Sequence, residues 1–266
     1  MKTRLIAGFS GLAIILPLLF LGPPICVELL VMAATGVALW EFAGIALPGR
    51  QKLAFAALGP AGLAVQMAIV WGADASVLPT LAVSTLGCLL FGLFVVDETE
   101  EGATAATRMV MGLLYISVLF SFLSQVRHLN DGVTWVFVSM LLAWLGDTGA
   151  YFAGKAFGNR KLFPRISPKK TWEGAIGGAI AVVAGMAVVK LVAVPHMGWG
   201  HVIALGLLGD VAGVVGDLVE SLIKRAAKVK DAGSFLPGHG GILDRIDSLL
   251  FTAPLTYLYV TITGLG

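Results

Sequence analysis

Apolar residues run continuously over long segments of this chain, and short polar connections separate the segments. Runs of about 18 or more apolar residues are long enough to cross a bilayer as α-helices. The runs lack the alternation of apolar and polar positions that a transmembrane β-barrel requires. The pattern therefore predicts an all-α fold, a polytopic transmembrane helical bundle of about nine spans. We place these spans at residues 5–21, 25–47, 53–71, 76–96, 109–126, 133–154, 174–194, 200–220 and 248–264.

The composition agrees with a membrane protein. Of the 266 residues, 58% are hydrophobic and 13% are charged, whereas a soluble domain carries about 25% charged residues. The mean hydropathy is +0.91. Lys2 and Arg4 precede the first run as in a signal peptide, but no small-residue cleavage site follows it, so we expect a retained span. Cys26 and Cys88 lie in apolar stretches and are expected to be free thiols.

The spans divide into two groups, and we expect no soluble domain. Residues 1–130 form the N-terminal transmembrane helices, about five spans. Residues 131–266 form the C-terminal transmembrane helices, about four spans, together with the polar loops that carry the candidate chemistry. Small residues recur four apart, as in Gly174–Gly178 and Gly209–Gly213, a spacing typical of closely packed membrane helices.

Basic residues predict how the bundle is oriented. The N-terminus and the even-numbered connections carry 16 of the 18 Lys and Arg residues, and the opposite face carries only Arg127 and Lys190. Because positive residues stay on the cytoplasmic side, we expect a cytoplasmic N-terminus and a C-terminus across the membrane. Six of the 16 lie in loop 155–173 and five in loop 221–247, a surplus that indicates an anionic ligand. The acidic stretch 97–101 is predicted to be a solvated loop.

Carboxylates inside apolar spans are costly and are therefore functional candidates. Asp147, Asp210 and Asp217 fit that description. Glu28 and Glu41 also lie inside spans, but no constellation of polar residues surrounds them. For these two glutamates we expect structural pairing or interfacial exposure.

Asp210, Asp217 and Lys224 recur every seven residues, so they share one helix face, which Ser221 continues. A salt-bridged packing seam would explain this stripe, and so would a functional site. The loop that follows favours a site because it combines glycines, cations and carboxylates, and glycines let backbone N–H groups approach a phosphate. Carboxylates also supply the oxygen ligands that Mg²⁺ prefers. This loop includes Lys228, Lys230, Asp231, Pro237-Gly238-His239-Gly240-Gly241, Asp244, Arg245 and Asp247.

The other basic loop contains Ser167-Pro-Lys-Lys-Thr-Trp-Glu173. Thr171 could cap the helix that follows, with Glu173 in its first turn. Capping does not explain Lys169 and Lys170, because cations before a helix N-terminus oppose its dipole. An anion bound there would resolve the conflict. Trp172 is expected to anchor the membrane interface.

The 27 residues from Ser221 to Asp247 resemble, without a gap, the signature of the phosphatidate cytidylyltransferase (CDP-diacylglycerol synthase) family. Asp147–Tyr151 and Ser167–Gly174 resemble other stretches that recur in that family, whereas the first five spans agree only in being apolar. The resemblance implies a nucleotidyltransferase that joins CTP to phosphatidate and releases CDP-diacylglycerol and pyrophosphate in phospholipid biosynthesis. It also implies Mg²⁺ as cofactor.

The resemblance implies site residues as well. The implied metal ligands are Asp217, Asp244 and Asp247, and we expect Asp217 and Asp244 to share one ion. The implied catalytic residues are Asp147, Glu173, Lys224, Asp231, His239 and Arg245, with Asp147 and Glu173 lining one polar cavity. The implied substrate-binding residues are Ser167, Lys169, Lys170, Thr171, Ser221, Arg225, Lys228, Lys230, Gly240 and Gly241.

The implied partners are CTP, phosphatidic acid, membrane lipid and a second copy in a homodimer, and we expect no nucleic acid. The implied location is the cytoplasmic (inner) membrane, with the active site facing the cytoplasm. A cation-coupled secondary transporter would also use intramembrane aspartates, but it needs no such cationic loops, and no repeat is evident. A membrane lipid or polyprenol kinase would also use a nucleotide and Mg²⁺. A CDP-alcohol phosphotransferase is disfavoured because its D-G-x-x-A-R pattern is missing.

Overall fold

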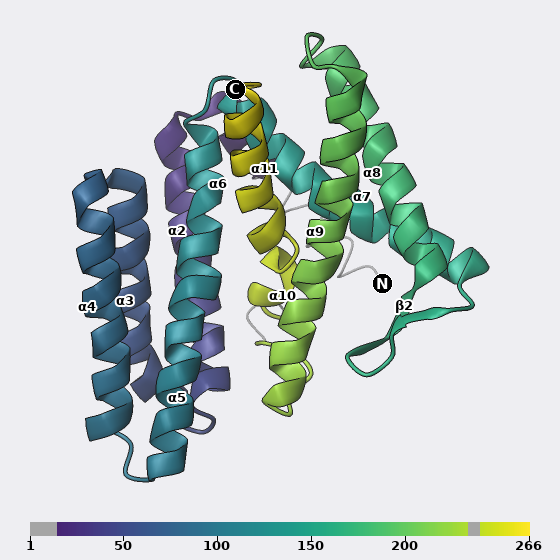
Figure 1. Ribbon diagram of the computed structural model, residues 1–266. Helices are drawn as coiled ribbons and strands as arrows, with labels where there is room; N and C mark the ends of the chain where they lie inside the picture. Colours follow the sequence, from purple (N-terminus) through teal and green to yellow (C-terminus); the bar gives the residue numbers. More distant parts are fainter. Residues whose placement is uncertain (1–14, 234–239) are drawn as a thin grey trace. The chain divides into compact units, whose positions relative to one another are not determined.

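The computed structural model describes residues 15–233 and 240–266, and these residues are almost entirely helical (Figure 1). Residues 15–21 are helical and precede α2. The longer elements are α2 (Pro24–Ala46), α3 (Gln51–Trp71), α4 (Asp74–Phe94), α5 (Thr99–Gly112), the π-helix η1 (Leu113–Val118), α6 (Leu119–Arg127), α7 (Gly132–Phe157), α8 (Trp172–Val192) and α9 (Trp199–Ala226). The chain ends in the short α10 (Leu243–Ile246) and in α11 (Leu249–Thr263).

Eight helical segments in the described residues are long and apolar enough to cross a membrane. They correspond to eight of the nine predicted spans, with α5, η1 and α6 forming one continuous segment and α10 and α11 another. The first predicted span, 5–21, lies mostly outside the described residues. The prediction of an all-α transmembrane bundle is confirmed.

Three predicted boundaries were wrong. The acidic stretch is exposed as expected, but α5 already begins at Thr99, so Glu100 and Glu101 lie in its first turn, where negative charge is favoured. The final span begins at Leu243 rather than at residue 248. The eighth span continues to Ala226, so Lys224 and Arg225 belong to the last turn of α9 and not to a loop.

The chain forms two compact units. The first comprises Met1–Gln125 with Asp231–Arg245, and the second comprises Val126–Lys230 with Ile246–Gly266. In the first unit, α2 and α5 enclose a core that includes Leu39, Phe42 and Met109. The outer helix α4 leaves many large apolar side chains exposed, as expected of a helix that faces lipid.

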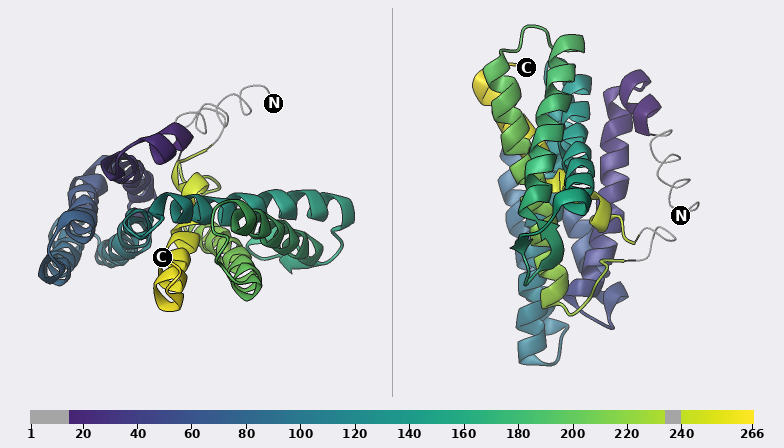
Figure 2. Two further views of the ribbon diagram at one scale, coloured as in Figure 1. Left: turned by 90° about the horizontal axis from the view of Figure 1, so that it is seen from above. Right: turned by 90° about the vertical axis from the view of Figure 1, so that its right-hand side faces the viewer.

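The second unit is held together by close helix packing. Helix α7 contacts α8, α9 and α11, and α8 also contacts α9 (Figures 1 and 2). A Cβ added at Gly178 would lie 2.9 Å from the carbonyl oxygen of Gly146, and one at Gly209 would lie 2.6 Å from the Leu142 side chain. The tight packing predicted from the glycine spacing is therefore confirmed at both positions.

A short hairpin joins α7 to α8 and was not predicted. Strand β1 (Lys161–Phe163) pairs antiparallel with β2 (Ser167–Thr171). Phe163 lies opposite Ser167 and Lys161 lies opposite Thr171, and the register shifts between these two pairs. The hairpin contains much of the basic loop 155–173, and its strand β2 contacts α9 through Lys170.

Candidate active site

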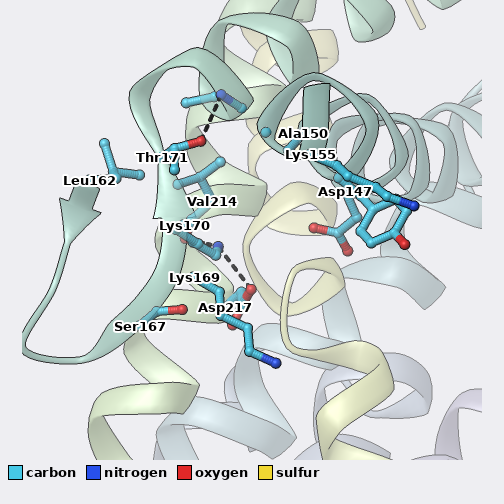
Figure 3. Close-up of a pocket in the computed structure, with 14 residues that line it drawn as sticks. Asp147, Ala150, Lys155, Leu162, Ser167, Lys169, Lys170, Thr171, Val214 and Asp217 are labelled. Atoms are coloured by element: carbon cyan, nitrogen blue, oxygen red, sulfur yellow. Dashed lines mark hydrogen bonds and ion pairs between the residues drawn. The ribbon is translucent and has the colours of Figure 1, made fainter. Parts of the chain in front are cut away.

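A cavity of about 420 Å³ opens in the second unit between α7, the hairpin, the start of α8 and α9 (Figure 3). Its lining combines cationic, anionic and hydroxyl groups, a mixture typical of a site that binds charged ligands. The polar lining residues are Asp147, Tyr151, Lys155, Ser167, Lys169, Lys170, Thr171 and Asp217. Six of these, Asp147, Ser167, Lys169, Lys170, Thr171 and Asp217, come from three segments, each 20 or more residues from the next, that were predicted to form one site.

Lys170 and Asp217 form the central ion pair of this cavity. The Lys170 Nζ lies 2.8 Å from Asp217 Oδ2 and also donates to the carbonyl oxygen of Val214, at 3.3 Å (Figure 3). Ser221 donates to Asp217 Oδ1 at 3.2 Å, one helical turn further along α9. Two cations directly before α8 oppose its dipole, and the ion pair with Asp217 offsets this repulsion for Lys170. Lys169 lines the cavity next to it.

Thr171 is the N-cap of α8, as predicted. Its hydroxyl accepts a hydrogen bond of 3.1 Å from the Gly174 N–H. Glu173 in the first turn has a different role from the one expected, since it is not among the residues that line the cavity. Its carboxylate accepts hydrogen bonds from the N–H groups of Asn159 and Arg160, at 3.1 and 3.2 Å. Glu173 therefore fixes the connection between α7 and β1.

Three carboxylates gather next to Asp217 in the second unit. One oxygen from each of Asp217, Glu220 and Asp247 lies within 4.8 Å of the others, a grouping that could hold a metal ion. Glu220 is 1% exposed and forms an ion pair with Lys224. Asp247 accepts a 2.6 Å hydrogen bond from the Ser248 N–H. The predicted proximity of Asp217 and Asp247 is confirmed, and hard oxygen donors of this kind suit Mg²⁺ or a similar cation.

Comparison with known proteins agrees with this arrangement. The sequence matches the model of the cytidylyltransferase family over residues 2–263. The chain belongs to the cytidylyltransferase family.

Its relatives include several bacterial enzymes. The phosphatidate cytidylyltransferase of Bacillus subtilis is 33% identical over 270 residues, which cover 98% of each chain. That of Brucella suis is 44% identical over 184 residues, 67% of this chain and 66% of the relative. That of Staphylococcus epidermidis is 31% identical over 260 residues, with 96% and 97% covered. Membership of this family makes the chain a nucleotidyltransferase, not a transporter or a kinase.

Two residues at the site of this cytidylyltransferase were missed in the sequence. Glu220 lies three residues after Asp217 and four before Lys224, so it shares their helix face, and that spacing could have identified it. Lys155 follows Asp147 by eight residues on α7, with Tyr151 between them, and these three side chains line the cavity together. Helical spacing could have identified both residues, but charged residues near a helix end are also common in proteins that have no functional site there.

Asp244 belongs to the first unit of the cytidylyltransferase, whereas Asp217 belongs to the second. Its carboxylate accepts hydrogen bonds from the N–H groups of Gly241, at 2.8 Å, and Ala232, at 3.1 Å. The cluster of carboxylates around Asp217 contains Glu220 and Asp247, whereas we expected Asp244 and Asp247. An ion shared by Asp217 and Asp244 therefore stays a prediction.

The remaining predicted residues of the signature have varied surroundings. Arg225 donates to the carbonyl oxygen of Val229 at 3.3 Å, and Gly240 has a φ of +79° that favours glycine. Asp210 is buried on α9 beside Gly146 and Gly178. His239 lies outside the described residues. Five charged residues of this set are solvent-exposed: Arg225, Lys228, Lys230, Asp231 and Arg245.

Proposed function

We propose that this cytidylyltransferase transfers the cytidylyl group of CTP to phosphatidate and forms CDP-diacylglycerol and pyrophosphate. The observation that carries the proposal is the cavity that Lys155, Lys169 and Lys170 line together with Asp217, one member of a carboxylate cluster, within helices apolar enough to lie in a bilayer. Both substrates are phosphorylated, and one is a membrane lipid. Curated relatives that carry the name phosphatidate cytidylyltransferase support the choice of lipid.

The reaction needs little covalent chemistry from the side chains of the protein. An oxygen of the phosphatidate phosphate attacks the α-phosphorus of CTP, and the bond from that phosphorus to the bridging oxygen of pyrophosphate breaks. The attacking phosphate is already ionised near neutral pH, so no side-chain nucleophile is needed. The residues of the cavity bring two anions together and neutralise their charge, with Lys155 contributed by α7 and Lys169 and Lys170 by β2.

The carboxylates of Asp217, Glu220 and Asp247 fit a magnesium ion, which would polarise phosphate oxygens and stabilise the charge on the leaving pyrophosphate. Lys170 and Lys224 pair with two of these three carboxylates, so three negative and two positive charges leave one net negative charge. A divalent ion would turn that balance positive and favour anionic substrates. Asp244 is proposed as a further ligand, contributed by the loop.

The charge distribution supports a location in the cytoplasmic (inner) membrane with the active site facing the cytoplasm. CTP would then reach the cavity from water, and the lipid would enter from the bilayer. The exposed cations Lys228, Lys230 and Arg245, with Arg225, would gather the anionic substrates. Asp147 would orient a substrate from the α7 wall, and Asp231 and His239 keep their proposed catalytic roles. A homodimer is proposed as the assembled form.

Product analysis tests the proposal directly. Detergent-purified protein is incubated with CTP labelled at the α-phosphorus, phosphatidate and Mg²⁺, and a cytidine-containing lipid is expected in the organic phase. CTP labelled at the γ-phosphorus should give labelled pyrophosphate and no labelled lipid. A lipid labelled only from the γ-phosphate would indicate a kinase. Ion uptake by proteoliposomes without turnover of CTP would indicate a transporter.

A further inference from the structure

Glu41 is a buried carboxylate of α2 that contacts a distant part of its own unit. It is 3% exposed. Its Oε1 accepts a hydrogen bond of 3.1 Å from the Ile242 N–H, and its Oε2 accepts one of 2.9 Å from the Leu243 N–H. These N–H groups belong to the end of residues 231–243, which we term the signature loop, immediately before Asp244. No polar partners for Glu41 were predicted, because the residues that donate to it lie 201 and 202 positions away in the chain.

The same carboxylate also lies against the beginning of that loop. A Cβ added at Gly233 would lie 2.5 Å from the Cδ and Oε1 of Glu41, and one at Gly241 would overlap its Oε2. Both glycines are therefore required for the close approach of backbone to carboxylate. Asp244 makes a parallel bridge, because it accepts from Ala232 at one end of the loop and from Gly241 at the other. Two carboxylates thus connect segments 232–233 and 241–243.

A carboxylate is chemically suited to this position. It offers two acceptor oxygens to two backbone N–H groups, whereas a glutamine amide offers one oxygen and would turn N–H donors toward the second. Hydrogen bonds to a charged acceptor are stronger than those between neutral groups. Burying a carboxylate within a membrane span is costly, so its two aligned donors must offset that cost.

We infer that Glu41 is a positioning residue of the reaction, whose carboxylate sets the conformation of the signature loop and so presents Asp244 and Arg245 for catalysis. The inference rests on the proposed function for its link to catalysis. The contact with the loop is independent of that link. The two hydrogen bonds that Glu41 accepts come from Ile242 and Leu243, so it acts through the loop.

The test compares Glu41→Gln with Glu28→Gln, a second buried carboxylate on the same helix, which accepts from the Trp71 indole instead. For Glu41→Gln we expect kcat to fall by roughly tenfold or more, and the Mg²⁺ concentration that gives half-maximal rate to rise. The KM for CTP should stay within about threefold, because the cavity lysines are unchanged. Glu28→Gln should retain wild-type values for all three.

A second measurement needs neither substrate nor metal. Lys230 is exposed and directly precedes the loop, so trypsin cleavage after it reports how well the loop is held. Cleavage should be faster in Glu41→Gln than in the wild type or in Glu28→Gln. If the wild type makes no cytidine lipid, the proposed function fails, while this comparison still tests the contact.

Gly233→Ala provides an independent variant should Glu41→Gln fail to fold. The added methyl group displaces the carboxylate without removing it, and kcat and cleavage should change in the same direction. Its control is Gly36→Ala on α2, where an added Cβ meets nothing within 4 Å. Wild-type turnover and cleavage in Glu41→Gln or Gly233→Ala, or an equal loss in Glu28→Gln, would overturn the inference.

Discussion

The polar residues of this protein are held by partners at two ranges along the chain: Thr171 caps Gly174 three residues away, whereas Glu41 accepts hydrogen bonds from Ile242 and Leu243, 201 and 202 residues away. Asp217 and Asp247 were expected together and are together, and Thr171 caps α8 as its position before the helix suggested. Glu41 could not be placed, because nothing local to α2 indicates the backbone N–H groups it accepts from. Long-range partners of this kind appear only when the chain is folded.

Glu220→Gln tests whether the carboxylate that the sequence did not single out takes part in metal binding. The amide keeps the size of the side chain but removes one negative charge from the cluster with Asp217 and Asp247. We expect the Mg²⁺ concentration for half-maximal rate to rise by roughly tenfold or more. Glu28→Gln, which removes the charge of a buried carboxylate of α2 outside this cluster, is the control, and titrations of initial rate against Mg²⁺ compare the two. Identical titration curves would remove Glu220 from the metal site.

Lys170→Gln tests the ion pair between Lys170 and Asp217 in the cavity. Losing the ammonium group removes a cation from the phosphate site and leaves Asp217 without its 2.8 Å partner. We expect kcat/KM for CTP to fall by roughly 10- to 100-fold with little loss of folded protein. Lys161→Gln, an exposed residue on strand β1 of the same hairpin, should have nearly wild-type kinetics. A fall in yield without a change in kcat/KM would assign Lys170 a role in folding alone.

At the scale of elements, apolar runs predicted the helices, but polar segments were harder to interpret. The end of α9 from Ser221 to Ala226 is helical although it carries Lys224 and Arg225, because its buried face continues that of the span. The sequence of β1 and β2 lacks the alternation of apolar and polar residues that would predict strands. These strands are short, and Glu173 and the Arg160–Trp172 backbone hydrogen bond hold the base of the hairpin.

Gly177→Ala tests the close contact of α7 and α8. An added Cβ would overlap the Cβ of Ala153, and both backbones are fixed by long helices. We expect the free energy of unfolding to fall by about 1–3 kcal/mol. Gly87→Ala on α4 is the matched control, because its Cβ meets nothing within 4 Å and alanine favours a helix. Thermal unfolding in detergent compares them, and equal midpoints would show that the helices can separate at no cost.

At the scale of the whole chain, hydropathy predicted the eight spans that the described residues contain, whereas it does not predict the division into units. The segment Asp231–Arg245 folds with the first 125 residues, although it is far from them in the sequence and lies between α9 and α11. The hydrogen bonds of Glu41 to Ile242 and Leu243 account for that association physically. No change of composition along the sequence indicates that residues 231–245 belong to the first unit.

Single cysteines test the orientation that the basic residues predict. Nine spans place the two ends of the chain on opposite sides, and an even number would place them on the same side. With Cys26 and Cys88 replaced, a membrane-impermeant maleimide added to intact cells should label Lys190→Cys and Gly266→Cys but not Lys2→Cys or Lys52→Cys. The latter two should react only after the membrane is opened, because 16 of the 18 basic residues lie on the side predicted to be cytoplasmic. Labelling of both ends from outside would mean that the segment at 5–21 does not cross the bilayer, and labelling of Lys52→Cys would reverse the orientation and move the CTP site away from its substrate.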